Sequence, residues 1–352
     1  TFLEKEIIKM KKFKIAIVGA TGAVGREMLR CVFQFNFPFE SIKLLASARS
    51  AGKEIEFEGH KFVVEELTEN SFEGVEVAFW SAGGSISEKY MKYAVEAGCV
   101  NIDNTSHFRM DPNVPLVVPE VNGEALVNHH GIISCPNCTT IMMCSALTRL
   151  NDEFDIERIV VSTYQAVSGA GVAGMEELYR QSQEVLDGKE PVAKTLPCAG
   201  DKKHFPIAFN CIPQVDKFDL SNGYSKEEMK MVNETKKIFN KDIEVNATCV
   251  RVPVLRGHSE SIYIETKKTI DMDKVFELLG NSTGIDLCDD LANQVYPMPT
   301  SFIGDELTHV GRKDLYKDNA LSLWITGDQL MKGAAYNSVD IGLKMIELGL
   351  LK

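Results

Sequence analysis

The sequence predicts an α/β protein in which a doubly wound parallel sheet is followed by a second domain built on a mixed sheet. Two observations predict this fold class. In the first third of the chain, short apolar runs alternate with helical patterns, and a glycine-rich turn follows the first run. In the middle, longer β-rich runs lack helices at regular intervals. The length of 352 residues agrees with two domains of about 150 residues each.

Short runs rich in Val and Ile predict the strands of the first domain. They lie at 14–18, 41–45, 75–79, 99–102, 116–118 and 131–133, and helical patterns at 24–35 and 87–97 separate them. Buried strands that alternate with helices are typical of a parallel sheet covered on both faces. We therefore predict a Rossmann-type domain.

The second domain is predicted from longer strands, at 158–163, 248–252, 261–265 and 321–325. Helices are expected only at 175–186 and 226–239 between them, and an amphipathic helix at 329–348 ends the chain. Strands that follow one another without crossover helices favour a mixed or antiparallel sheet. This pattern indicates an α+β domain.

Composition excludes several classes of function. The formal net charge of -12 argues against nucleic-acid binding, which needs a surplus of Lys and Arg on one face. No apolar run approaches the roughly 20 residues that span a bilayer. Nine scattered cysteines are unlike a secreted disulfide scaffold and favour a reducing, cytoplasmic setting. Met10 resembles a natural start, so residues 1–9 are interpreted as an upstream extension or a cloning remnant.

A glycine turn follows the first predicted strand and opens the first predicted helix. Its residues are Gly19, Ala20, Thr21, Gly22, Ala23, Val24 and Gly25. Glycines permit a tight turn and a close approach to a pyrophosphate, which then lies at the positive end of the helix. The alternative is a tight turn without a ligand. The spacing is a weak signal alone and a stronger one between a strand and a helix.

The second predicted strand ends without the acid that usually holds the ribose 2′-hydroxyl of NAD. Instead Arg49 follows, between Ser47 and Ser50. A guanidinium flanked by hydroxyls suits a 2′-phosphate, so we predict NADP as the cofactor. A solvated surface loop is the alternative.

A candidate nucleophile lies where the first domain ends. Pro136 and Asn137 interrupt a strand, and a helical pattern starts at Thr139, so Cys138 is expected at a helix N-terminus. The helix dipole and free N–H groups there favour a reactive thiolate. Cys135 and Cys138 form a single CxxC that lacks the other half of a zinc site, so no metal is expected.

His258 is the matching candidate for general acid–base chemistry. It follows a glycine turn between two predicted strands, where a side chain can project into a cleft. An imidazole titrates near neutral pH and can serve as a general base. A cysteine or a histidine alone is more often structural, so it is the pair that indicates catalysis.

Five motifs together resemble bacterial aspartate-semialdehyde dehydrogenases, and the resemblance covers about residues 14 to 348. The motifs are Gly-Ala-Thr-Gly-Ala-Val-Gly at 19–25, Asp-Asn-Thr-Ser at 103–106, Pro-Asn-Cys at 136–138, Ser-Thr-Tyr-Gln-Ala-Val-Ser-Gly-Ala-Gly at 162–171 and Arg-Val-Pro-Val-Leu-Arg-Gly-His-Ser at 251–259.

The resemblance implies roles for individual residues. Cys138 would be the nucleophile, His258 the acid/base, and Gln165 would orient the intermediate. Arg251 would hold the substrate α-carboxylate and Glu227 its ammonium group. The phosphate would be bound by three side chains, Arg109, Asn137 and Lys230. The cofactor would be bound by the glycine turn and by Ser47, Arg49, Ser50, Ser81, Ala82, Gly83, Ser168, Gly169, Gly171 and Gln329.

The resemblance also implies the arrangement and the reaction. Residues 10–137 and 329–352 would form the NADP-binding domain. Residues 138–328 would form a catalytic and dimerisation domain resembling that of glyceraldehyde-3-phosphate dehydrogenase, so a homodimer is expected. The expected reaction is the reversible, phosphate-dependent reduction of aspartyl 4-phosphate to aspartate 4-semialdehyde through a cysteine thioester. It would supply lysine, diaminopimelate, threonine, methionine and isoleucine biosynthesis.

Two alternatives remain open. An N-acetyl-glutamyl-phosphate reductase would use the same chemistry, but its substrate has no ammonium group for Glu227. A non-catalytic NADP-binding regulator would sense the redox state of the cofactor, and the presence of Cys138, Gln165 and His258 together disfavours it. Turnover distinguishes a regulator from an enzyme.

Overall fold

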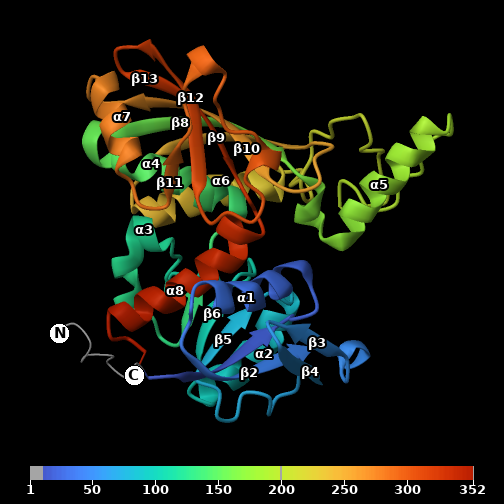
Figure 1. The fold of residues 1–352 in the computed structure, drawn as a ribbon. Helices are drawn as coiled ribbons and strands as arrows, with labels where there is room; N and C mark the ends of the chain where they lie inside the picture. Colours follow the sequence, from blue (N-terminus) through green and yellow to red (C-terminus); the bar gives the residue numbers. More distant parts are fainter. Residues whose placement is uncertain (1–10, 199, 352) are drawn as a thin grey trace, which may run out of the picture. The chain divides into compact units, whose positions relative to one another are not determined.

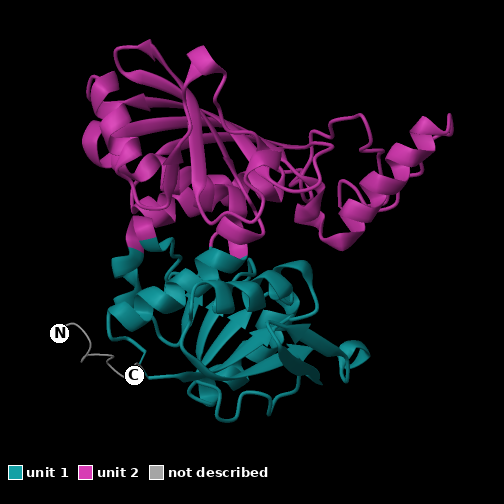
Figure 2. Cartoon of the chain, in the orientation of Figure 1, with its two compact units in different colours: residues 1–119, 123–135, 335–352 teal, residues 120–122, 136–334 magenta. Residues whose placement is uncertain are grey.

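The computed structural model describes residues 11–198 and 200–351, which form two units (Figure 2). Among the described residues, unit 1 comprises 11–119, 123–135 and 335–351, and unit 2 comprises 120–122, 136–198 and 200–334. The interpretation of residues 1–9 lies outside the described residues.

Unit 1 contains a seven-stranded sheet in the order β3-β4-β2-β1-β5-β6-β7 (Figure 1). All neighbouring pairs are parallel except β3 and β4. This confirms the predicted Rossmann-type sheet. Its elements are β1 (Phe13–Val18), α1 (Ala23–Gln34), β2 (Phe39–Ala46), η1 (Ala48–Ser50), β3 (Glu54–Phe57), β4 (His60–Glu66), β5 (Val77–Trp80), α2 (Gly84–Glu96), β6 (Val100–Asp103), η2 (Gly123–Asn128), β7 (Ile132–Ser134) and α8 (Tyr336–Glu347).

Two details of unit 1 differ from the prediction. The run at 116–118 is not a strand: Leu116 forms a single bridge with Ser134, and Pro119, which lacks an N–H, then opens the short helix α3 (Pro119–Asn122). The hairpin of β3 and β4 was not predicted. Its many charged residues obscure the alternation of apolar and polar side chains that indicates a strand. Gly59, with φ 76°, marks the turn between the two strands.

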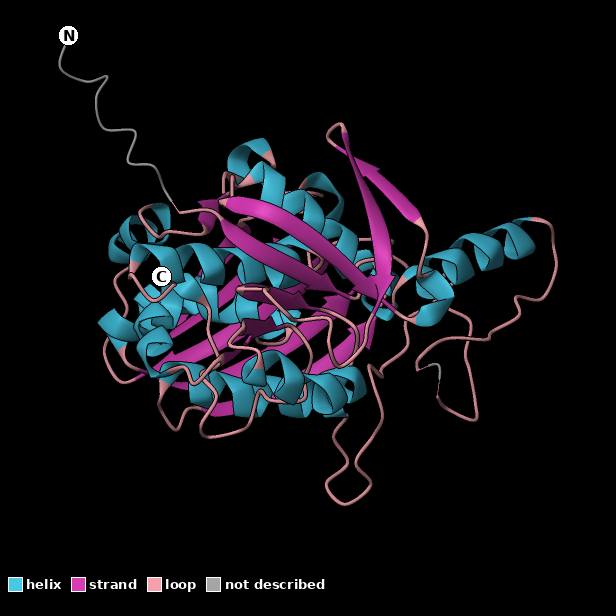
Figure 3. Ribbon diagram, turned by 90° about the horizontal axis from the view of Figure 1, so that it is seen from below, coloured by secondary structure: helices cyan, strands magenta, loops and turns pink. Residues whose placement is uncertain are grey.

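Unit 2 contains a six-stranded sheet in the order β11-β12-β13-β10-β8-β9. Its mixed character was predicted, whereas the strands β11 and β12 were not. The pairs β8–β9 and β11–β12 are parallel and the others antiparallel. Figure 3 shows the strands and helices from a second direction. The main elements are α4 (Cys138–Phe154), β8 (Ile156–Gln165), η3 (Val167–Ala170), α5 (Val172–Leu186), α6 (Lys226–Phe239), β9 (Glu244–Arg251), β10 (His258–Thr266), α7 (Met272–Gly280), β11 (Ile285–Leu287), η4 (Leu291–Asn293), η5 (Pro299–Ser301), β12 (Thr308–Lys317) and β13 (Ala320–Gly327).

The last predicted helix is divided in the structure. Residues Met331–Ala335 form one turn of π-helix, and α8 follows it. A π-turn inserts an extra residue into a helix and often marks a functional position. The periodicity of the apolar residues continues across it, which explains why the sequence predicted one uninterrupted helix.

The core of unit 2 fixes the start of α4. Met142, Leu147 and Leu150 are fully buried and belong to one cluster with Ile159 of β8 and Ile262 of β10. Burial of each such side chain stabilises the fold by about 1.5–3 kcal/mol. Because α4 is anchored along its length, its first residue is held in a defined place beside the sheet.

Candidate active site and dinucleotide pocket

Two cavities contain most of the predicted site residues, and each lies within one unit. A cavity of about 440 Å³ in unit 1 is lined by the glycine turn. A cavity of about 340 Å³ in unit 2 is lined by Cys138 and His258.

The glycine turn of unit 1 has two positions that exclude a side chain. Gly19 has φ 89°, and a Cβ there would lie 2.9 Å from the backbone N of Ala82. A Cβ on Gly25 would lie 2.2 Å from the carbonyl O of Gly19. Gly22 is the N-cap of α1 and has no side chain to occupy the helix end. The N-terminus of α1 is therefore open to an anion.

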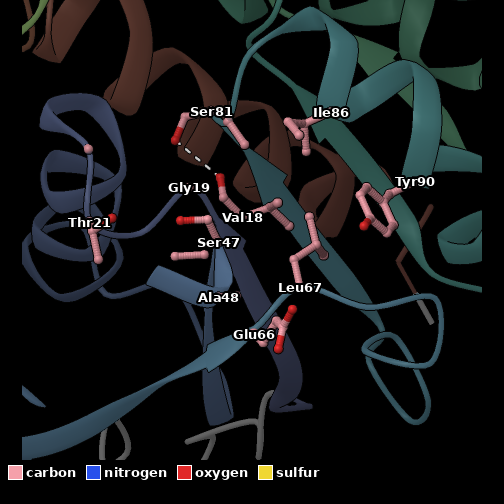
Figure 4. A pocket seen from close by; sticks show the side chains of 13 residues that line it. Val18, Gly19, Thr21, Ser47, Ala48, Glu66, Leu67, Ser81, Ile86 and Tyr90 are labelled. Atoms are coloured by element: carbon pink, nitrogen blue, oxygen red, sulfur yellow. Dashed lines mark hydrogen bonds between the residues drawn. The ribbon is translucent and has the colours of Figure 1, made fainter. Parts of the chain in front are cut away.

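Figure 4 shows the pocket between this turn and the ends of the neighbouring strands. Ser81 Oγ donates a hydrogen bond to the carbonyl O of Val18 at 3.2 Å. The predicted cofactor residues that line the pocket are Gly19, Thr21, Gly22, Ser47, Ser81 and Ala82. Arg49 and Ser50 belong to the adjoining turn η1 and are not among its lining residues, nor are Ala20, Ala23, Val24, Gly25 and Gly83.

The sequence interpretation missed the far wall of this pocket. Glu66, Leu67, Ile86 and Tyr90 line it together with Ala48. Glu66 ends β4, and its Cα is paired in register with that of Ala46 at the end of β2. Glu66 could have been predicted as a pocket residue only if β4 had been recognised as the neighbour of β2.

In unit 2, Cys138 is the first residue of α4, as predicted. Asn137 caps the helix: its Oδ1 accepts hydrogen bonds from the N–H of Thr139 at 3.2 Å and from the hydroxyl of Thr139 at 2.5 Å. Cys138 is partly accessible, whereas Cys135 and Cys144 are buried. Burial raises the pKa of the Cys144 thiol and that of Cys135 to about 12. Only Cys138 of these three combines a helix N-terminus with access to the cavity.

Cys135 has a buried polar contact of its own. It lies in unit 1, and its Sγ is 3.2 Å from the hydroxyl oxygen of Ser338. A thiol with so high a pKa is a poor partner for disulfide exchange.

Glu227 is the electrostatic centre of the cavity. Its Oε1 accepts hydrogen bonds from Asn137 Nδ2 at 2.9 Å and from Gln165 Nε2 at 3.0 Å. Its Oε2 lies 2.9 Å from Lys230 Nζ. Burial opposes ionisation, but the Lys230 charge and the hydrogen bonds outweigh it and lower the pKa of Glu227 to about 2. Glu227 is thus a carboxylate at every physiological pH.

Lys230 is shared between two carboxylates. Besides Glu227, it donates to Asp216 Oδ2 at 3.0 Å. The prediction did not include Asp216, which also lines the cavity. It comes from a loop that the sequence alone does not bring near α6. Their joint charge holds the ammonium group at the cavity wall.

His258 is fully buried, and its hydrogen bonds determine its tautomer. The backbone N–H of Ala166 donates to His258 Nδ1 at 3.0 Å. The neutral ring therefore carries its proton on Nε2. Burial and the nearby Arg251 charge lower the pKa of His258 to about 3, and Glu227 only partly opposes them. The resting imidazole is therefore neutral and offers a hydrogen-bond donor at Nε2; its role as the acid/base stays a prediction.

Arg251 lies beside His258 at the end of β9. It is buried, and its Nη1 donates to the carbonyl O of Ala166 at 2.7 Å. Gly169 faces both side chains: a Cβ there would lie 2.8 Å from Arg251 Nη1 and 3.5 Å from His258 Nε2. Gly169 therefore leaves room for these two groups at the cavity wall.

The structure brings together most predicted residues of unit 2. One cavity is lined by Asn137, Cys138, Gln165, Gly169, Glu227, Lys230, Arg251 and His258. Ser168 accepts a short hydrogen bond from the Gln329 amide, and Gly171 with φ 77° precedes α5. Arg109 belongs to unit 1, where its Nη2 donates to the carbonyl O of Asn104 at 2.9 Å. Thr195, Pro197 and Cys198 line the cavity but were not predicted.

Two family models match the chain, one in each half. Residues 14–129 match the semialdehyde dehydrogenase NAD binding domain, and residues 147–332 match the semialdehyde dehydrogenase dimerisation domain. No helix in the described part of the chain is long and apolar enough to cross a membrane. Within residues 11–198 and 200–351, no three His, Cys, Asp or Glu side chains gather as metal ligands would.

Individual relatives match over nearly their whole length. The chain is 49% identical to aspartate-semialdehyde dehydrogenase of Bacillus subtilis over 341 residues, covering 96% of this chain and 98% of the relative. It is 51% identical to that of Campylobacter jejuni over 348 residues, with the same coverage. The structure of aspartate semialdehyde dehydrogenase II of Vibrio cholerae complexed with ASA has a TM-score of 0.90 at 44% identity, covering 96% of this chain and 99% of that one.

Proposed function

Because this chain belongs to the aspartate-semialdehyde dehydrogenase family, we propose that it catalyses the reversible, NADP-dependent reductive dephosphorylation of L-aspartyl 4-phosphate to L-aspartate 4-semialdehyde. One observation carries the proposal. Cys138 at the N-terminus of α4 shares a cavity with Gln165, Glu227, Arg251 and His258. A nucleophile, a hydrogen-bond donor and two opposite fixed charges thus surround one small volume.

The Cys138 thiolate attacks the acyl carbon and expels phosphate, which leaves a thioester on Cys138. Covalent catalysis divides a difficult reaction into two easier steps. NADPH, when bound, supplies the hydride that reduces this thioester. Gln165, whose Nε2 is held by Glu227, orients the bound acyl group. The aldehyde is released when the carbon–sulfur bond breaks.

His258 serves as the acid of this reaction. Its Nε2–H can donate a hydrogen bond to the substrate oxygen where negative charge develops. Full proton transfer needs the imidazolium form, whose pKa is low in the protein alone because of burial and Arg251. An anionic substrate in the same cavity would raise this pKa, since opposite charge favours the protonated ring. Substrate binding thereby prepares the acid.

The fixed charges suit an amino-acid substrate. Arg251 provides a planar fork for the α-carboxylate, and the carboxylate of Glu227 attracts the ammonium group. An N-acetylated substrate has no such group, so Glu227 favours the aspartyl substrate over that rival. Lys230, Arg109 and the Asn137 amide are the proposed phosphate ligands. The carboxylates of Glu227 and Asp216 weaken the attraction of Lys230 for an anion, so Arg109 is expected to contribute more.

The residues of unit 1 fit a nicotinamide dinucleotide. Gly19 and Gly25 allow the turn to pack tightly where a Cβ would clash with backbone atoms, and the open N-terminus of α1 suits the pyrophosphate. We propose NADP rather than NAD on the basis of Arg49, Ser47 and Ser50. Glu66 in the same pocket would oppose a phosphate group, and Arg49 in the adjoining turn η1 is the cation proposed to offset it.

The sheet of unit 2 supports a homodimer. One face packs on α4, and on the other Tyr164 and Trp324 lie with ring centroids 5.4 Å apart. Tyr164 is 37% exposed, and exposed aromatic side chains are typical of the centre of protein interfaces. We propose a cytoplasmic homodimer that supplies lysine, diaminopimelate, threonine, methionine and isoleucine biosynthesis.

Phosphate dependence tests the reaction. Oxidation of L-aspartate semialdehyde with NADP should require inorganic phosphate, and arsenate should replace it. Arg109→Ala and Lys230→Ala should raise the phosphate KM by about one to two decades, since a charge-assisted hydrogen bond is worth about 1.5–3 kcal/mol. A phosphate-independent rate in the unaltered enzyme contradicts the acyl-phosphate reaction. A phosphate KM unchanged in both variants contradicts only these two ligands.

A further inference from the structure

We propose that Gly333 is a positioning residue for Cys138 and that the buried Lys332–Glu120 ion pair keeps it in place. This inference rests on the proposed role of Cys138 as the nucleophile. Gly333 lies in the π-helical turn Met331–Ala335, and all the residues concerned belong to unit 2.

The backbone of Gly333 lies against that of Cys138. A Cβ on Gly333 would lie 2.6 Å from Cys138 Cβ and 3.1 Å from Cys138 Cα. The atoms in the way belong to the start of α4 and cannot rotate aside. Gly333 is not among the residues with positive φ, so its backbone conformation does not itself demand glycine. The contact with Cys138 is what excludes a side chain.

A buried ion pair, Lys332–Glu120, lies next to Gly333 in the chain. Lys332 Nζ and Glu120 Oε1 are in direct contact, and their side chains are 1% and 5% exposed. Glu120 also accepts a hydrogen bond from Ser145 Oγ at 2.6 Å. Ser145 follows Cys138 by seven residues, two turns along α4. The pair therefore ties the π-turn to the same helix whose first residue Gly333 contacts.

A further glycine makes room for this pair. A Cβ on Gly284 would lie 2.9 Å from Glu120 Oε1 and 3.2 Å from Lys332 Nζ. A buried ion pair contributes little net stability, because both charges lose their water. The Lys332–Glu120 pair is therefore better explained by the geometry that it fixes than by the stability that it adds. It defines the position of Lys332 and hence that of Gly333.

The start of the segment is tied to the other side of the cavity. Asp328 Oδ1 accepts a hydrogen bond from the N–H of Leu330 at 3.0 Å. Gln329 Oε1 accepts one from the N–H of Gly257 at 2.8 Å, next to His258. The segment 328–333 thus connects the turn before His258 with the first residue of α4, and it sets the spacing between the acid and the nucleophile.

A side chain at position 333 should affect turnover more than substrate binding. A methyl group at position 333 must displace the Cys138 backbone, and with it the sulfur, from the attacking position. A misplacement of about 1 Å can reduce the rate on the order of a hundredfold. Arg251 and Glu227 lie on other elements, so the KM for the aldehyde should change much less than kcat.

The experiment compares Gly333→Ala with a matched control, Gly342→Ala. Gly342 is also a buried helical glycine, and a Cβ there would lie 2.8 Å from the Phe37 ring, but it is in α8 and lines neither cavity. We expect Gly333→Ala to lower kcat about a hundredfold, with the KM within about threefold. The rate of Cys138 alkylation by iodoacetamide against pH should change in parallel. Gly342→Ala should retain kcat and the alkylation profile, whatever its melting temperature.

A second pair of variants keeps the proposal testable if Gly333→Ala does not fold. Lys332→Met is compared with Lys313→Met, because Lys313 forms an equally buried pair with Asp289 in the same unit and does not line the cavity. Both should lose stability, and only Lys332→Met should alter Cys138 alkylation and kcat. Equal effects in the two variants, or unaltered kcat and alkylation in Gly333→Ala, would overturn the proposal.

Cys138→Ser, measured alongside, separates this inference from the proposed function. If Cys138→Ser retains turnover, the nucleophile assignment fails and the positioning role fails with it. If Cys138→Ser is inactive while Gly333→Ala behaves as the unaltered enzyme, only the positioning role fails.

Discussion

Replacing Glu227 with Gln is expected to lower the free energy of unfolding by about 3 kcal/mol at neutral pH and to cost much less near pH 2. The pKa of Glu227 is about 2 in the fold, against an ordinary value of 4.5. Each pH unit between these values corresponds to about 1.4 kcal/mol, which gives the magnitude. Breaking a buried ion pair independently predicts about 3–5 kcal/mol. The lower end of this range applies because Lys230 retains its ion pair with Asp216, at 3.0 Å, when Glu227 is replaced.

The sign of the pH dependence follows from the lowered pKa. Unfolded chains bind a proton at Glu227 below about pH 4.5, while the folded protein resists until about pH 2. The stabilisation is therefore complete above pH 4.5 and is lost as the pH falls through 2. Gln does not titrate, so the difference between the two proteins should shrink across this window.

Urea unfolding at pH 7 and pH 3, followed by circular dichroism, measures this difference. Glu228→Gln is the matched control on the same helix. It belongs to the capping box of α6, where its Oε2 accepts from the Ser225 N–H at 2.6 Å, and Gln is also a capping-box residue. Its effect on the free energy of unfolding should be smaller, because Gln can keep the capping-box hydrogen bond. A Glu227→Gln cost that is the same at pH 7 and pH 3 would refute the electrostatic reasoning.

Three further substitutions test other parts of the site. Arg251→Lys should lower kcat/KM by at least tenfold in steady-state assays, because an ammonium cannot reproduce the planar fork; unaltered efficiency would remove Arg251 from the substrate site. Gly25→Ala should weaken NADP binding measured by calorimetry, and lower the melting temperature, since its Cβ would lie 2.2 Å from Gly19 O; normal affinity would contradict the steric argument. Arg49→Glu should weaken NADP much more than NAD in the same titration, and equal losses would exclude Arg49 as the selector.

Much of the fold could be predicted from local patterns. The strand β1, the glycine turn and the helix α1 follow one another within some twenty residues, so periodicity and turn chemistry were sufficient there. Cys138 at the start of α4 could also be predicted, because Pro136 breaks the preceding strand and the helical pattern begins directly afterwards. Cys138 and His258 were singled out from their local settings, and the family motifs supplied the roles predicted for them, because the two residues are far apart in the sequence.

Other features depend on contacts that no local pattern records. Asp216 joins Lys230 across a loop, and Glu66 reaches the dinucleotide pocket only because β4 pairs with β2. The protonation of His258 depends on burial and on a backbone N–H from Ala166. The need for glycine at position 333 comes from α4 packing against it. The sequence by itself determined the elements and the chemical groups, whose signals are local, whereas the tertiary structure alone decided charge states and close approaches, which depend on neighbours distant in the chain.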